Sequence, residues 1–229
     1  IPWQNRLIGG GHYNQYGGNQ TVNTRYLAAN PGFISRYPYD GIVLTAPLTI
    51  GGSERSFHEV IWNTWPITSA MVEPIRKDIQ RTRWQHLTDC FLNISMTDAA
   101  DGKATPDFTN DADWAVVENN IRMAARICRH SNVKGFWLDT EQYANYADSN
   151  DKFPLGRDST TILRRRGRQW IEAAQSEKPD IQIIITFAWS PDAIEYGPLK
   201  GVIPFLDGIL EGIKSPALLH HGYENTFYY

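Results

Sequence analysis

The chain has little of what marks several functional classes. It contains only two cysteines, Cys90 and Cys128, and both have the apolar neighbours typical of buried free thiols rather than of a disulfide framework. Its six histidines include no pair at the i, i+4 spacing of metal ligands on a helix. We therefore expect no metal site, and no motif indicates another cofactor.

Positive charge and long apolar runs are also scarce. The 22 Lys and Arg are outnumbered by 25 Asp and Glu, and the net charge of -3 argues against nucleic acid as a partner. The only basic run, 164–168, falls in a predicted helix and is interpreted as a solvated, ion-paired face. No apolar run approaches the roughly 18 residues of a membrane span, so no membrane partner is expected. Because the chain starts at Ile1 without a signal peptide, we expect a processed or truncated product.

Apolar runs of strand length alternate with segments of helical periodicity. The predicted strands are 6–8, 39–46, 86–96, one within 133–143, 181–189, 205–211 and 217–221. The predicted helices are 24–37, 69–83, 114–129 and 159–176. This alternation is typical of an α/β protein with a parallel sheet covered by helices.

Two α/β architectures compete for this pattern. A doubly wound sheet usually carries a glycine-rich phosphate turn, and Gly9-Gly10-Gly11 does not fit the G-x-G-x-x-G spacing. A (β/α)8 barrel of the TIM type is favoured because long polar and aromatic loops follow the predicted strands, where barrel active sites form. The pattern supplies about seven strands and a barrel has eight. We therefore expect one domain, 1–229, that forms a partial barrel lacking its C-terminal end.

Two carboxylates at the mouth of the fourth strand point to chemistry. Alternate residues of a strand point the same way, so Gly135, Trp137, Asp139 and Glu141 are expected to share one face. Like charges held close together favour a proton on one of them, and glycosidic bond cleavage needs one protonated and one ionised carboxyl group. The pair predicts Glu141 as general acid/base with Asp139 tuning its pKa. A solvated strand end or a salt-bridged pair is the alternative.

Aromatic residues support carbohydrate as the ligand. The chain has eight Trp and eleven Tyr, and sugar rings stack their apolar faces on aromatic planes while their hydroxyls bind polar neighbours. Trp84, Trp114 and Trp170 are expected in the core. The predicted substrate-binding residues are His12, Tyr13, Tyr16, Trp62, Trp65, Asn93, Tyr143, Trp189, Glu211 and Tyr223.

Five stretches carry a resemblance to a known group of enzymes. They are Arg6-Leu7-Ile8, Tyr39-Asp40-Gly41-Ile42-Val43-Leu44, Gly135-Phe136-Trp137-Leu138-Asp139-Thr140-Glu141-Gln142-Tyr143, Arg164-Arg165-Arg166-Gly167-Arg168 and Gly222-Tyr223-Glu224. Their succession resembles (β/α)8-barrel glycoside hydrolases of environmental bacteria, many of them secreted. The resemblance implies a retaining enzyme with Glu141 as acid/base and Glu224, after strand seven, as nucleophile. It also implies polysaccharide degradation in an extracellular or periplasmic location.

The acid pair is also similar to the end of the family 18 chitinase motif, D-G-x-D-x-D-x-E. Gly135, Asp139 and Glu141 occupy matching places, whereas Lys134 and Trp137 stand where that motif has Asp. The substrate-assisted mechanism of that family is therefore only weakly supported.

Three functions remain open on the sequence. The first is a glycoside hydrolase that cleaves a poly- or oligosaccharide with two carboxylates, and the second is a barrel that binds saccharide without cleaving it. The third is a metal-assisted lyase or isomerase with Asp139, Glu141 and Glu211 as ligands.

Overall fold

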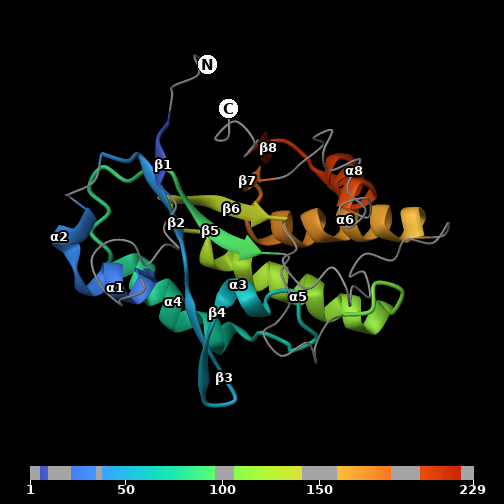
Figure 1. Cartoon of the computed structure of the whole chain (residues 1–229), viewed down its shortest axis with the longest axis horizontal. Coiled ribbons are helices and arrows are strands. Elements are labelled where there is room, and N and C mark those ends of the chain that lie inside the picture. The colour runs from blue at the N-terminus through green and yellow to red at the C-terminus, as the bar shows by residue number, and fades with distance from the viewer. Residues whose placement is uncertain are drawn as a thin grey trace, which may run out of the picture.

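The computed structural model describes residues 6–9, 22–34, 38–95, 106–140, 159–186 and 202–222. Six parallel strands form its central sheet. The strands are β1 (Ile8–Gly9), β2 (Gly41–Leu44), β5 (Cys90–Ser95), β6 (Val133–Asp139), β7 (Gln182–Ile185) and β8 (Leu218–His221). Their spatial order is their order along the chain, and each neighbouring pair is parallel. A doubly wound sheet reverses its strand order, so this sheet is a singly wound, curled half-barrel (Figure 1).

Helices cover one side of this sheet. They are α1 (Thr24–Ala29), α2 (Pro31–Ile34), α3 (Phe57–Val60), α4 (Ser69–Arg81), α5 (Asp111–Ile127), α6 (Ser159–Glu177) and α8 (Val202–Gly212). In Figure 1 they follow an arc from α1 and α4 through α5 to α6 and α8. Right-handed crossovers between sequential parallel strands place the connecting helices on one face in this way.

The helix starts follow from local capping. Asn110 precedes α5, and its side-chain oxygen accepts hydrogen bonds from the backbone N–H groups of Ala112 at 2.9 Å and Asp113 at 3.4 Å. Asp111 and Asp113 then place negative charge in the first turn, where the helix dipole favours it. Asn23 caps α1 in the same manner, through the N–H of Tyr26 at 2.9 Å.

Alternation along β6 separates two faces of the sheet. Phe136 and Leu138 are fully buried on the helix side, and the Phe136 ring meets Trp170 of α6 edge-on with a centroid separation of 5.7 Å. Trp137 and Asp139 are only partly buried and lie on the other face. The predicted common face of Gly135, Trp137 and Asp139 is thereby confirmed.

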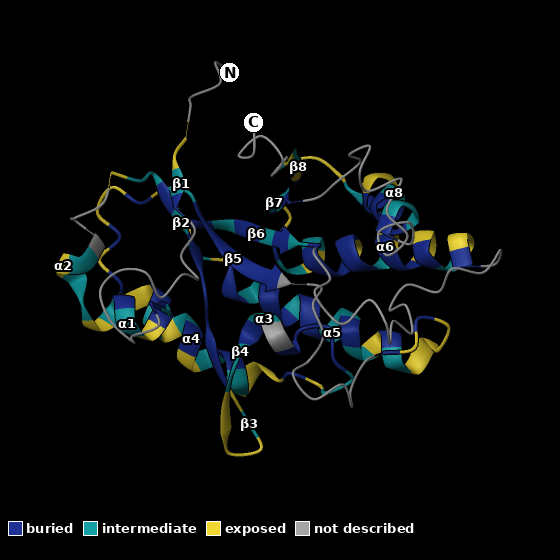
Figure 2. Ribbon diagram, viewed as in Figure 1, coloured by how far each residue is buried: buried dark blue, intermediate teal, exposed yellow. Residues whose placement is uncertain are grey.

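An aromatic cluster fills the space between the sheet and the outer helices. Trp62 stacks on Trp170 at 6.2 Å between centroids and 5° between planes, and Trp114 and Phe205 close around them. Figure 2 shows this interior as a buried layer with the exposed residues on the outer helix surfaces. Trp84, Trp114 and Trp170 are buried as predicted.

Most predicted elements are confirmed. The predicted helix 24–37 is divided into α1 and α2, and the short helix α3 was not predicted. Two further differences concern strands. The segment 205–211, predicted as a strand, belongs to helix α8, whose buried Val202, Phe205, Leu206 and Ile209 follow helical spacing. A short apolar run does not distinguish a buried strand from a buried helix. Here packing against α6 selects the helix. The main sheet therefore has six strands among the described residues, in place of the expected seven.

The second difference is an unpredicted hairpin. Strands β3 (Pro47–Ile50) and β4 (Ser53–Ser56) pair antiparallel outside the main sheet. Gly51 and Gly52 join them with φ angles of 57° and 83°. A Gly-Gly pair between two strands is a hairpin signal because both turn positions need positive φ.

Helices α6 and α8 approach so closely that their contact requires glycine. A Cβ on Gly208 would overlap the carbonyl of Arg164, and a Cβ on Gly167 would overlap that of Phe205. The two backbones are therefore in direct contact at these positions.

We expect Gly208→Ala to lower the free energy of unfolding by about 1–3 kcal/mol, because the added methyl group forces the helices apart. Gly32→Ala, where no atom lies within 4 Å of the added Cβ, is the matched control. It should leave stability unchanged or raise it by up to about 1 kcal/mol. Urea unfolding midpoints measure both, and equal midpoints would contradict the close helix contact.

Candidate functional site

The polar site lies where parallel strands end together. Asp139 is the last residue of β6 and pairs in register with Ser95, while Trp137 pairs with Asn93 of β5. Register neighbours in a parallel sheet share a face and lie about 4.8 Å apart, so Asn93, Trp137 and Asp139 sit together away from the helices. Asn93 was predicted as a substrate contact, and the structure brings it beside Trp137.

The same face continues onto the next two strands. Trp137 pairs with Ile184 of β7, which pairs in turn with His220 of β8. His220 is half-buried, and burial lowers its pKa, so the imidazole is neutral at pH 7. Its side chain can then both donate and accept a hydrogen bond.

His220 is a site residue that sequence reasoning missed. The signal was available in alternation, because His220 and Gly222 occupy every second position of the strand that precedes Glu224. The register shows that His220, and not His221, pairs with the row of Trp137 and Ile184.

Hydrogen bonds beyond the ladder extend this edge. Thr186 donates its backbone N–H to the Leu138 carbonyl at 3.0 Å and its hydroxyl to the same oxygen at 3.2 Å. The N–H of Gly222 donates to the Ile185 carbonyl at 2.7 Å. The ends of β6, β7 and β8 are thus held together next to Asp139, which is only partly buried.

The predicted catalytic and binding residues divide into two groups. Asp139 alone of the three predicted catalytic residues lies within the described residues; Glu141 and Glu224 lie outside them. The predicted contacts outside the described residues are His12, Tyr13, Tyr16, Tyr143, Trp189 and Tyr223. Their predicted roles stay predictions.

Trp62 and Trp65 are placed differently from the expected rim. Trp62 belongs to the aromatic cluster on the helix side of the sheet and not to the face of Asn93 and Trp137, so its placement as a substrate contact is corrected. Trp65 is partly buried against the same core. Asn120 of α5 holds the stretch 62–67 in place. Its side-chain amide donates to the carbonyls of Asn63 at 3.1 Å and Trp65 at 2.9 Å, and its oxygen accepts from the N–H of Ile67 at 2.8 Å.

Glu211 is corrected as well. It lies at the end of α8 and not at the end of a strand, and it forms ion pairs with Arg164 and Arg168 of α6. Hydrogen bonds from Arg164 and then Arg168 hold its pKa below the ordinary value. The end of α8 precedes β8, so Glu211 is at the amino edge of the sheet, whereas Asp139 is at the carboxyl edge. These two members of the predicted metal-ligand set therefore do not lie together.

Three of the four arginines of the basic run in α6, Arg164, Arg165 and Arg168, are exposed and ion-paired. This agrees with the prediction of a solvated, ion-paired helix face. Arg166 differs because its side chain is 1% exposed. Its Nε donates to the Phe108 carbonyl at 2.9 Å, its Nη2 donates to Asp111 at 2.6 Å, and its guanidinium lies 5.3 Å from the Trp114 ring centroid. Arg166 therefore ties α6 to the start of α5.

The remaining expectations concern thiols, metals and membranes. Cys90 and Cys128 are free and buried as predicted, and burial raises the pKa of Cys90 to about 12. Within the described ranges no three His, Cys, Asp or Glu side chains are grouped to hold a metal ion. No helix among the same residues has both the length and the apolar character to cross a membrane.

Comparisons with known proteins add no relative: no protein-family model, no curated protein and no solved structure matches the chain.

We expect Arg166→Met to lower the free energy of unfolding by about 2 kcal/mol, because the buried Phe108 carbonyl loses its donor. Arg165→Met is the matched control, since Arg165 is exposed and contacts the same Asp111 at 3.1 Å. It should cost less than about 1 kcal/mol. Chemical unfolding followed by tryptophan fluorescence measures both, and an equal loss in the two variants would remove the anchoring role of Arg166.

Proposed function

We propose that this protein is a glycoside hydrolase whose active site lies at the carboxyl edge of the sheet. The proposal rests on one observation: Asp139 ends β6 on the face of a sequentially ordered parallel sheet that lies opposite the described helices, beside Asn93 and Trp137. Active sites of (β/α)8 barrels form at this edge. We propose the full TIM-type barrel as the architecture to which the half-barrel corresponds.

The polar and aromatic groups of this face suit a saccharide. Trp137 offers an apolar plane for a sugar ring, and the amide of Asn93 and the neutral imidazole of His220 supply donors and acceptors for hydroxyl groups. The aliphatic Ile184 between Trp137 and His220 adds apolar surface to the same row. This mixture is typical of ligand sites that combine an apolar wall with a few polar groups.

The proposed mechanism uses two carboxyl groups. Glu141 donates its proton to the glycosidic oxygen as the bond to the anomeric carbon breaks, and the Glu224 carboxylate attacks that carbon. Water then displaces the glycosyl ester while Glu141 takes up the proton of the water, so the anomeric configuration is retained. The negative charge of Asp139 favours the protonated form of Glu141 before the first step.

A saccharide-binding protein without hydrolysis is the second candidate. The row of Asn93, Trp137 and His220 favours it, because these groups recognise a sugar whether or not the bond is cleaved. Saccharide binding by wild type together with no release of reducing sugar would favour this function over hydrolysis.

We expect Glu141→Gln to reduce kcat by about 10²- to 10⁴-fold on aryl glycosides with poor leaving groups, because the general acid is lost. The kcat on dinitrophenyl glycosides should fall much less, because dinitrophenolate leaves without protonation. The control Glu172→Gln, on the exposed face of α6, should match wild type. Wild-type turnover of poor leaving groups by folded Glu141→Gln would refute the assignment.

We expect Asp139→Asn to shift the pH–rate profile. Removal of the negative charge lowers the pKa of Glu141, so Glu141 gives up its proton at a lower pH. The alkaline limb of the profile, where activity is lost, should therefore move down by about one pH unit. Asp180→Asn, an exposed carboxylate in the turn before β7, is the matched control and should leave the profile in place. An unchanged profile in Asp139→Asn would reduce Asp139 to a structural residue.

A further inference from the structure

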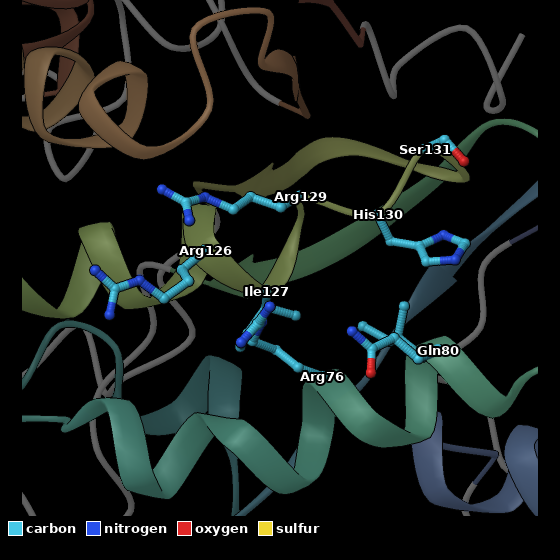
Figure 3. A pocket seen from close by; sticks show the side chains of 8 residues that line it. Arg76, Gln80, Arg126, Ile127, Arg129, His130 and Ser131 are labelled. Atoms are coloured by element: carbon cyan, nitrogen blue, oxygen red, sulfur yellow. The ribbon is translucent and has the colours of Figure 1, made fainter.

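A hollow of about 280 Å³ lies between α4 and α5, away from the proposed active site. Its polar lining consists of Arg76, Gln80, Arg126, Arg129, His130 and Ser131, and Ile79 and Ile127 supply apolar surface. Figure 3 shows Arg76 and Gln80 rising from α4 toward the end of α5, where the other polar side chains are carried.

The hollow is at the opposite edge of the sheet from Asp139. The turn that carries His130 and Ser131 connects the end of α5 to the start of β6, whereas Asp139 ends the same strand. A seven-residue strand spans about 20 Å at 3.3 Å per residue, so a ligand in the hollow does not reach Asp139.

The arginines of the hollow are partly used by ion pairs. Arg126 donates to Glu177 at 3.2 and 2.7 Å and to the Ser69 hydroxyl at 2.6 Å. Arg129 donates to the Glu177 side chain at 2.6 Å and to its carbonyl at 3.0 Å. Glu177 thus holds both guanidinium groups in fixed positions.

Donors and positive charge remain after these pairs are counted. Arg76 bonds Glu73 through Nη1 at 2.8 Å, and among the described residues its Nε and Nη2 have no acceptor, nor has Nη1 of Arg129. Two carboxylates, Glu73 and Glu177, face three arginines, so one positive charge is uncompensated. The site is therefore rich in oriented donors and short of anions.

His130 adds a further donor. Its Nδ1 accepts the backbone N–H of Asn132 at 3.3 Å, so the neutral ring carries its proton on Nε2. Burial lowers the pKa of His130, and its ring lies 5.7 Å from that of Trp84, centroid to centroid. The imidazole is thus a neutral, fixed part of the wall.

We propose that this hollow binds a phosphate group, either as the free anion or as the monoester of a small organic molecule. Guanidinium forks match the tetrahedral oxyanion through paired N–H donors, and phosphate accepts several of them at once. The cavity is slightly below the roughly 300 Å³ at which drug-sized ligand pockets begin, which suits a compact ligand. Ile79 and Ile127 offer contact to the organic part of an ester.

Calorimetric titration of the full chain with inorganic phosphate and with phenyl phosphate, at constant ionic strength, tests the proposal. We expect saturable binding of at least one probe and a loss of affinity of about tenfold or more in Arg76→Gln and in Arg129→Gln. Tighter binding of phenyl phosphate identifies a monoester site, and equal or weaker binding identifies a site for the free anion.

The matched control is Arg81→Gln, which removes the same charge from an exposed position on α4 outside the hollow. It should bind both probes like wild type. No saturable binding of either probe up to about 10 mM, or an equal loss in Arg81→Gln and Arg76→Gln, would overturn the proposal. Thermal unfolding of each variant without phosphate checks that its fold is intact. The result is independent of glycosidase activity at the other edge.

Discussion

The apolar layer between the sheet and its helices is the constraint on which the rest of the structure depends. Leu92, Phe136, Leu138, Ile183 and Ile185 are buried on the helix side of their strands, and the aromatic cluster around Trp62 and Trp170 continues that layer outward. Because side chains alternate along a strand, this burial fixes the opposite face as the place for Asn93, Trp137, Asp139 and His220. Packing on one side thereby sets the candidate chemistry on the other.

Much of the fold could be predicted because strand and helix periodicities are strong along this chain. The strand within 133–143 and the helix over 159–176 emerge close to the observed β6 and α6. The strand prediction for 205–211 was wrong because seven mostly apolar residues fit the period of a strand as well as that of a helix. Only the contact with α6 through Gly167 and Gly208 selects the helix. The prediction of Trp62 as a substrate contact was wrong for a related reason. A tryptophan in a loop gives no sign of which side of the sheet it will cover.

The candidate site could be predicted in part. The position of Asp139 follows from the end of an apolar run, and Asn93 was predicted as a substrate contact. That Asn93 lies beside Trp137, and that His220 shares their face, is set by strand register, which depends on tertiary packing. Glu211 shows the converse, because a carboxylate that reads as a strand end is held on the outer helix layer by Arg164 and Arg168. The arginine-lined hollow joins side chains from α4, from α5 and from the turn before β6, and no local sequence pattern brings them together.

The central claim is that the face opposite the described helices, at the carboxyl edge of the sheet, receives a saccharide. A crystal structure of the catalytically impaired Glu141→Gln protein soaked with an oligosaccharide tests this claim most directly. The account predicts sugar density against Trp137, with its hydroxyl groups within hydrogen-bond distance of Asn93, Asp139 or His220. Sugar density on the helix side of the sheet or at the arginine-lined hollow, with the face of Trp137 empty, would contradict it.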